Sequence, residues 1–410
     1  MDASTLYALR DAAGVPSHPV IFLILGVATW ALHIAAVHVM LGASALTLWG
    51  AFSKDDLKRR LAATMLNTAK VSVSIAIVIG VAPLLFVQVI YDPFWYASNV
   101  LSAWWVIGFI AILILGYLAM YVFYYANKDL TAKKGVTCPG SMVISIALLL
   151  VVGFIMHVLT QQMLSPEKWV EWYAPNGVIN ASGQKIHDYN IWRFLFFISL
   201  SAPVTGAWLL AMRRYLQGKE AGEDANYLAL LGSLAQKLAI IGGLVVVVFG
   251  ALWMATLPEK AAGFALSPWV IVTAVALIGT VLLPTLLGKK LDTGFWGFAP
   301  FAVGAVALII LGTAREALRF TILYGVHGYN PLDYKIVMDW YSTILFFGTF
   351  AIIGGAALAY MLTVAWQVGQ SKEKVYTPSP AVDKIGTVAI WLIVAWMVQF
   401  FAIGFYVWAR

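Results

Sequence analysis

Two histidines lie inside the first long apolar segment of this 410-residue chain. His33 and His38 occur between Pro19 and Phe52, a stretch longer than the roughly 20 residues that cross a bilayer as a helix. An imidazole at membrane depth is costly unless it has a partner. That partner is a metal, a haem iron, a proton path or a carbonyl of a neighbouring helix, so both histidines are candidate functional residues.

The spacing of His33 and His38 decides what they can share. Residues five apart point about 140° away from each other on a helix of about 3.6 residues per turn. We therefore predict that the two rings face different neighbours and do not bind one iron together. The other histidines are His18, His157, His187 and His327, and each has packing or interfacial hydrogen bonding as an alternative role.

A charged group lies near the end of the eighth apolar segment. Arg315 and Arg319 are four residues apart and share a helix face, whereas Glu316 is expected to turn off that face. Guanidinium groups at membrane depth need anions, and they bind carboxylates such as haem propionates in a bidentate manner. The alternatives are an internal ion pair with Glu316 and a contact with a lipid headgroup.

The composition identifies the class of protein. The chain is 62% hydrophobic and only 11% charged, which is typical of a polytopic membrane protein. The single cysteine, Cys138, excludes an all-cysteine iron–sulfur site and an internal disulfide, and without a CxxCH motif the chain carries no c-type haem. The net charge of +7 falls in short loops and does not indicate nucleic-acid binding.

We predict an all-α transmembrane bundle that forms one integral membrane domain over residues 1–410. The expected spans are 20–52, 70–91, 101–127, 141–163, 191–212, 228–256, 268–287, 295–325, 336–367 and 385–408. Lysine and arginine are concentrated in alternate loops, which indicates that these loops face the cytoplasm and that both termini lie outside. The basic set includes Lys54, Lys58, Arg59, Arg60, Lys128, Lys133, Lys134, Arg213, Arg214, Lys219, Lys289, Lys290, Lys372, Lys374 and Lys384, and the sparse set includes Arg10, Lys168, Lys185, Lys260, Lys335 and Arg410.

The segment from Ser165 to Asn190 is the longest predicted outer loop and is expected to form a small lid. No span contains the paired, deeply placed carboxylates of a proton-driven transporter, and no pair of spans is broken by glycine or proline in corresponding halves. These absences weaken a transporter interpretation.

Four stretches in the first half resemble subunit I of the cytochrome bd-type quinol oxidases. That family has a helix-one histidine followed nine residues later by Gly, and His33 precedes Leu41-Gly42 in the same way. The other stretches are Gly80-Val81-Ala82 through Trp95, Gln162-Met163-Leu164-Ser165-Pro166, and Arg193-Phe194-Leu195 through Val204-Thr205-Gly206-Ala207. The similar half covers residues 19–215, and the half from 228 to 410 is less similar.

The chain also departs from that family. Phe196 and Phe197 stand where the family has the helix-five ligand of its low-spin haem, and Ser102–Tyr125 contains no acid. The Gly-Arg-Gln-Pro-Trp run and the long quinol-binding loop are absent. The resemblance therefore carries over one ligand, His33, but not the low-spin site, the quinol site or the proton route. His157 and Met163 are candidates for a replacement ligand.

The resemblance implies a haem b-containing electron-transfer subunit of a membrane oxidoreductase in a bacterial-type inner membrane. Its candidate cofactor residues are His33, His38, His157, Met163, Arg315 and Arg319, with His33 and His157 as candidate iron ligands. The expected partners are other membrane subunits, an outer-face c-type cytochrome and the lipid bilayer. Two alternatives stay open: a cofactor-free membrane anchor in a larger complex, and a proton-coupled transporter that uses His33 and His38 as a relay.

Overall fold

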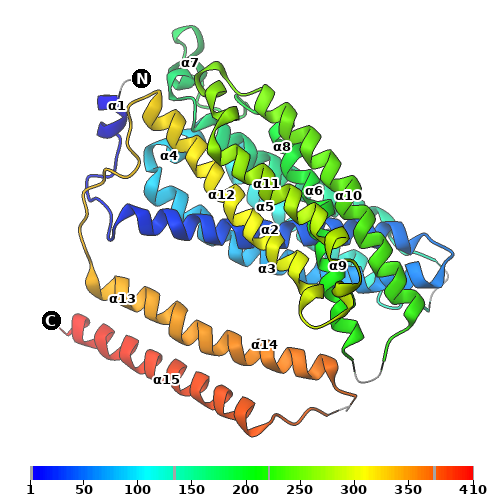
Figure 1. Ribbon diagram of the computed structural model, residues 1–410. Coiled ribbons are helices and arrows are strands. Elements are labelled where there is room, and N and C mark those ends of the chain that lie inside the picture. Colours follow the sequence, from blue (N-terminus) through cyan, green and yellow to red (C-terminus); the bar gives the residue numbers. More distant parts are fainter. Residues whose placement is uncertain (1–2, 133–134, 220–221, 373–374, 410) are drawn as a thin grey trace. The chain divides into compact units, whose positions relative to one another are not determined.

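The computed structural model describes residues 3–132, 135–219, 222–372 and 375–409. Within these ranges the secondary structure is helical, apart from one isolated bridge between Val15 and Ile336. Ten helical segments are long and apolar enough to cross a membrane (Figure 1). The predicted all-helical fold class and the expected number of spans are confirmed on this basis, and the chain is an integral membrane protein.

The spans follow one another along the chain with short connections. They are α2 (Pro19–Ala51), α3 (Asp56–Ile90), α5 (Ala103–Ala126), α6 (Pro139–Gln162), α8 with α9 (Ile191–Ser199 and Ser201–Gln217), α10 (Ala225–Ala255), α11 (Pro268–Leu287), α12 (Ala299–Gly325), α13 with α14 (Trp340–Gly348 and Gly355–Gln370) and α15 (Pro380–Trp408). Shorter elements are α1 (Ala3–Ala8), α4 (Asp92–Leu101), α7 (Trp169–Tyr173), and the 3-10 segments η1 (Pro166–Lys168) and η3 (Glu259–Leu266). Lys133, Lys134, Lys374 and Arg410, which entered the prediction of orientation, lie outside the described residues.

Two helix boundaries are set by local features that hydropathy alone misses: a capping aspartate and a proline. The helix that carries the second span begins at Asp56, well before the expected span core at residue 70. The carboxylate of Asp55 accepts a hydrogen bond of 2.9 Å from the Leu57 N–H and caps the helix. The fifth span is divided into α8 and α9 around Leu200. Pro203 lacks an N–H, so it cannot bond the carbonyl of Ser199 four residues earlier.

The described residues form two compact units. Unit 1 comprises Met1–Gly14, His18–Arg214 and Ala225–Tyr334, and unit 2 comprises Val15–Ser17, Tyr215–Asp224 and Lys335–Arg410. In unit 2, α15 packs against α13 and α14 as an antiparallel neighbour (Figure 1). Gln399 of α15 donates a hydrogen bond of 2.7 Å to the Tyr341 hydroxyl of α13. In unit 1, α2 and α3 form the most extensive helix pair.

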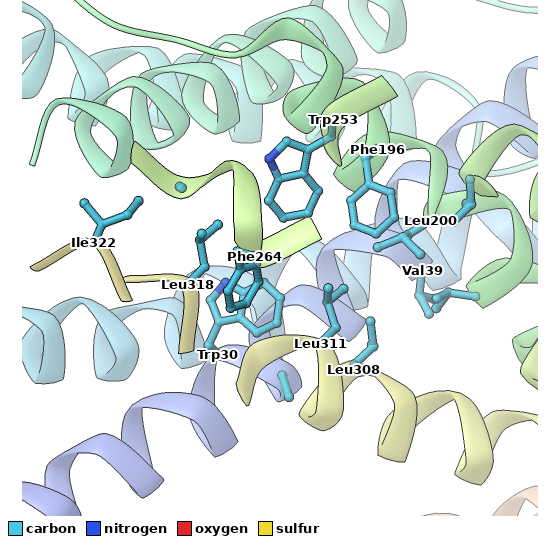
Figure 2. Close-up of a cluster of buried hydrophobic side chains, with 14 residues drawn as sticks. Trp30, Val39, Phe196, Leu200, Trp253, Phe264, Leu308, Leu311, Leu318 and Ile322 are labelled. Atoms are coloured by element: carbon cyan, nitrogen blue, oxygen red, sulfur yellow. The ribbon is translucent and has the colours of Figure 1, made fainter. Parts of the chain in front are cut away.

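An aromatic cluster fills the centre of unit 1 where α2, α8, α10 and α12 converge. Figure 2 shows Trp253 and Phe196 side by side, with Trp30 and Phe264 nearby. The ring centroids of Phe196 and Trp253 are 5.3 Å apart, and Phe197 meets the Trp30 ring edge-on at 5.9 Å. Such offset and edge-on pairs stabilise a core beyond the burial of their area, so this cluster fixes α2 relative to α8 and α10.

A guanidinium closes unit 1 where its first and last segments meet. Arg10 lies 4.5 Å from the ring centroid of Tyr7, 4.3 Å from that of Tyr329 and 4.1 Å from that of Tyr334. It also donates a hydrogen bond of 2.6 Å to the Tyr329 hydroxyl and further bonds to the carbonyl oxygens of Asn330 and Asp333. Arginine over aromatic faces is favourable, and this contact ties the segment after α1 to the segment after α12.

The contact between α2 and α9 requires a residue without a side chain. A Cβ atom at Gly42 would lie 1.8 Å from Oγ1 and 2.7 Å from Cβ of Thr205. The same Thr205 hydroxyl donates a hydrogen bond of 3.3 Å to the backbone carbonyl of His38. Gly42 therefore allows the close approach that brings α9 to the histidine-bearing face of α2.

We expect Gly42→Ala to lower the stability of the protein. The added methyl group must displace Thr205, and overpacking of this kind costs about 1–3 kcal/mol. Thermal unfolding of the purified protein in detergent measures the change. Gly108→Ala is the matched control, because a Cβ atom at Gly108 in α5 would have no neighbour within 4 Å in the described structure. Equal melting temperatures for the two variants would contradict the close-approach interpretation.

Candidate functional site

His33 is anchored through one ring nitrogen and open at the other. Nδ1 lies 2.8 Å from the backbone carbonyl oxygen of Ala76 on α3 and donates to it. A Cβ atom at Gly80 would lie 2.7 Å from the Nδ1 and Cε1 atoms of His33, so a glycine provides the space for this ring. In the described part of the chain Nε2 has no hydrogen bond, and the His33 side chain is partly exposed. This arrangement is typical of a metal-ligating histidine, whose second nitrogen donates to a carbonyl.

His38 faces a different helix. Its Nδ1 atom lies 3.1 Å from the hydroxyl of Ser201 at the start of α9, and only 1% of its surface is exposed. Because His33 contacts α3 and His38 contacts α9, the prediction that the two rings face different neighbours is confirmed. Nε2 of His38 is buried without a hydrogen bond in the described structure.

His157 has both ring nitrogens occupied. Nε2 accepts a hydrogen bond of 3.1 Å from the Asn190 N–H, and Nδ1 lies 2.7 Å from Nη1 of Arg193. The ring also packs against Phe154 and Phe194, with centroid distances of 6.0 and 5.7 Å. Ligation of an iron by His157 would require the loss of one of these contacts, and its role as a ligand stays a prediction.

Met163 is fully buried at the end of α6. It belongs to an apolar cluster with Leu159, Trp169 and Tyr91, which is distinct from the cluster around Trp30. Its role as a candidate ligand stays a prediction.

Arg315, Glu316 and Arg319 form one buried ion group. The Glu316 carboxylate lies 2.9 Å from Nη2 of Arg315 and 2.8 Å from Nη1 of Arg319. The Tyr91 hydroxyl donates a further hydrogen bond of 3.0 Å to this carboxylate. Glu316 lies off the helix face that Arg315 and Arg319 share, and both guanidinium groups reach around the helix to its carboxylate. The internal ion pair named as an alternative is present.

Arg193 is a third buried arginine that sequence reasoning did not assign to the site. Only 8% of its surface is exposed, and it contacts His157 and the Thr160 hydroxyl. Among the described residues, no carboxylate lies within ion-pair distance of it. The charges of Arg315, Arg319 and Glu316 nevertheless act on it. An arginine three residues into an apolar span is the signal that could have identified it.

Aromatic rings connect the arginines. The Arg315 guanidinium lies 4.2 Å from the ring centroid of Trp30, and the Arg193 guanidinium lies 5.2 Å from that of Phe197. Since Trp30 and Phe197 contact each other, the two cations flank an aromatic pair. We call Arg193, Arg315, Glu316 and Arg319 the arginine cluster. It holds three positive charges and one negative charge, and Nε of Arg315 is buried without a partner in the described structure.

The predicted lid is organised around a buried amide. Gln162 is fully buried, and its Oε1 atom accepts hydrogen bonds of 3.0 Å from the Ser102 hydroxyl and from the His187 N–H. His187 stacks on Trp172 at a centroid distance of 5.1 Å. His18 has a local role, because its Nδ1 accepts from the Val20 N–H at the start of α2. These contacts give His18 and His187 structural roles.

A second ion group joins the lid to η3 and to the end of α12. Lys260 donates hydrogen bonds of 2.6 Å to Glu167 and 2.8 Å to the Leu164 carbonyl, and Nε2 of His327 lies 3.3 Å from Glu167. Burial raises the pKa of Glu167, but the Lys260 ammonium outweighs this effect and holds it below 4.5. Burial, and then Lys260, lower the pKa of His327 below 6.5.

We expect the lid to be best protected at neutral pH and to loosen in acid. A depressed pKa of Glu167 gives stability above about 4.5 that is lost as the pH falls through the folded value. The pKa of His327 is also depressed, so the unfolded segment binds a proton at a higher pH than the folded lid does. The stability of the lid therefore begins to fall as the pH drops below about 6.5. Hydrogen exchange over residues 165–190, corrected for intrinsic rates, measures the change. Glu167→Gln should lose the more acidic step, and an unchanged profile in this variant would contradict the assignment.

The part of the chain that the structure describes contains no group of three or more His, Cys, Asp or Glu residues that could hold a metal ion. One small cavity of about 20 Å³ is lined by apolar residues such as Leu200, Val204 and Leu308, and a shallow hollow of about 370 Å³ lies at Phe295, Trp296 and Ala302. Neither includes His33 or His38.

No protein-family model and no curated protein matches this chain. A functional proposal therefore rests on the chemistry of the site itself.

We expect Glu316→Gln to destabilise the protein strongly. The substitution leaves three buried guanidinium groups without a carboxylate, and removal of one partner from a buried ion pair costs about 3–5 kcal/mol. Unfolding in detergent, followed by circular dichroism, measures this loss. Asp55→Asn is a useful control, because Asp55 pairs with Lys58 at an exposed helix start, where such a pair contributes about 0–1 kcal/mol. A small effect at Glu316 would contradict the interpretation that this carboxylate is needed to neutralise Arg315 and Arg319.

Proposed function

We propose that the protein is a haem b-binding electron-transfer subunit of a membrane oxidoreductase. The observation that carries this proposal is the net charge of +2 in the arginine cluster, next to an α2 helix whose His33 presents a free Nε2 atom. Trp30, one helical turn before His33, lies against Arg315. A haem carries two propionate carboxylates, and their charge of −2 balances the net charge of +2 in the arginine cluster.

The residues present fit this group in two respects. His33 has the neutral imidazole that haem iron takes as an axial ligand, and the Ala76 carbonyl fixes the tautomer that leaves Nε2 unprotonated. The Arg315 guanidinium has an Nε atom without a partner, and the Arg193 guanidinium has no carboxylate beside it in the described structure. The N–H groups of both are donors suited to carboxylates. When bound, haem b supplies one-electron transfer.

His33 would hold the iron, and Arg193, Arg315 and Arg319 would hold the propionates. Glu316 keeps two of these guanidinium groups in place through its carboxylate. His38, His157 and Met163 have no assigned role in this proposal, because His38 and His157 face other helices and Met163 packs in a separate cluster.

The resemblance to subunit I of the bd-type oxidases supports the same proposal through His33. The partners that agree with it are other membrane subunits and an outer-face c-type cytochrome, because this chain lacks a CxxCH motif. A bacterial-type inner membrane is the proposed location, with both termini outside. Oxygen reduction is not part of the proposal, since the acids expected in Ser102–Tyr125 are missing.

A cofactor-free membrane anchor is the second candidate. The observation that favours it is that the Glu316 carboxylate accepts hydrogen bonds from both Arg315 and Arg319. These contacts neutralise part of the positive charge without a ligand. The two candidates differ in haem content, which is directly measurable.

We expect the purified protein to show haem b bands in a reduced-minus-oxidised visible spectrum, confirmed by a pyridine haemochrome count. His33→Ala should lose these bands because the axial nitrogen is removed, whereas His187→Ala, which alters a histidine stacked outside the spans, should keep them. Arg193→Gln should keep the haem but lower its midpoint potential, because removal of a positive charge favours the oxidised state. Absence of a Soret band in the wild-type protein would refute the proposal in favour of the anchor.

A further inference from the structure

A polar stripe crosses the otherwise apolar surface between α3 and α5. On α3 it contains Asn67, Lys70 and Ser74, whose spacing of three and four residues places them on one face. On α5 it contains Tyr117, Tyr121 and Tyr124, which follow the same spacing. We call these six residues the tyrosine–lysine stripe. It lies apart from the arginine cluster, and the proposed function does not use it.

The hydroxyl groups of the stripe converge. The Ser74 hydroxyl lies 3.5 Å from both the Tyr117 and the Tyr121 hydroxyls, and it donates its own proton to the Lys70 carbonyl at 3.2 Å. The rings of Tyr117 and Tyr121 are 4.7 Å apart. Contacts of 3.5 Å between hydroxyls are long, so a carbonyl oxygen placed beside these groups would be a stronger acceptor for a tyrosine proton.

Lys70 supplies a cation beside these hydroxyls. Its ammonium lies 3.9 Å from the ring centroid of Tyr124 and 3.5 Å from Oδ1 of Asn67. Among the described residues, no carboxylate lies within ion-pair distance of it. The side chain is partly exposed, as are those of Tyr117, Tyr121 and Tyr124, so the stripe is accessible from the membrane.

The position along α3 defines the depth of each group. Lys70 lies twenty residues before Ile90, which is about 30 Å at 1.5 Å per residue and equals the thickness of the hydrocarbon core. If Ile90 marks one interface, Lys70 lies at the other, and Ser74 lies about 6 Å deeper. A phospholipid has the same order of groups, with its phosphate at the interface and its ester carbonyls just below.

We propose that the tyrosine–lysine stripe is a binding site for an anionic phospholipid. Lys70 pairs with the phosphate, the Tyr117 and Tyr121 hydroxyls donate to an ester carbonyl, and the acyl chains lie along the apolar surfaces of α3 and α5. A cation without a carboxylate partner favours an anionic ligand, and the hydroxyl donors below it favour a ligand with acceptors at two depths.

Native mass spectrometry of the purified full chain tests this proposal. Phosphatidylglycerol and phosphatidylcholine with identical acyl chains are added separately, and the bound fraction of each is measured. The wild-type protein should prefer phosphatidylglycerol by about tenfold, because the choline cation of phosphatidylcholine offsets the phosphate charge that Lys70 meets. Lys70→Gln should abolish this preference. Lys237→Gln should keep it, because Lys237 is an exposed lysine of α10, outside the tyrosine–lysine stripe.

A second variant tests the deeper contacts. Tyr117→Phe combined with Tyr121→Phe keeps the rings and Lys70, so it should weaken both lipids while the preference for phosphatidylglycerol persists. Equal loss of preference in Lys70→Gln and Lys237→Gln would overturn the proposal, because it would show a general surface-charge effect. Displacement of phosphatidylglycerol by a short-chain ubiquinone analogue, with no preference between the two lipids, would also overturn it and identify a quinone site. All of these results are independent of haem content.

Discussion

The need to neutralise charge away from water constrains unit 1 more than any other interaction. Glu316 is the carboxylate that meets Arg315 and Arg319, and Tyr91 adds a hydrogen bond from the end of α3. A buried charge without a partner costs several kcal/mol, so α3 and α12 must keep their relative positions. Arg193 and His157 extend this constraint to α8 and α6. Four helices are thereby fixed around one polar group, and the aromatic cluster of Trp30, Phe196 and Trp253 packs beside it.

The two histidines of α2 illustrate how one helix serves two environments. His33 is held by a carbonyl of α3 in space that Gly80 leaves free, whereas His38 is enclosed against Ser201. Both local arrangements depend on small or polar residues at close helix contacts, as is common where helices pack in membranes. The consequence is that a nitrogen able to bind a ligand stays open at His33, while His38 is shielded.

The sequence was sufficient for the features that depend on hydropathy and helical period. It predicted the all-helical fold, the ten spans and the divergent directions of His33 and His38. It did not predict the contacts that depend on long side chains, because a guanidinium on a long, flexible stem reaches across helix faces, as Arg315 and Arg319 do toward Glu316. Hydropathy did not indicate where α3 begins, because its first turns are charged and Asp55 caps them. Arg193 was missed because its neighbours His157 and Trp253 are distant in sequence.

The Arg10 contact has a consequence for how the chain can vary. Three tyrosine rings and two carbonyls hold Arg10 at the point where the segment before α2 meets the segment after α12. Unit 1 is therefore closed by its own residues before the chain enters α13. Removal of α13–α15 would therefore leave these contacts of the histidine-bearing bundle in place, because none of their residues belongs to that segment.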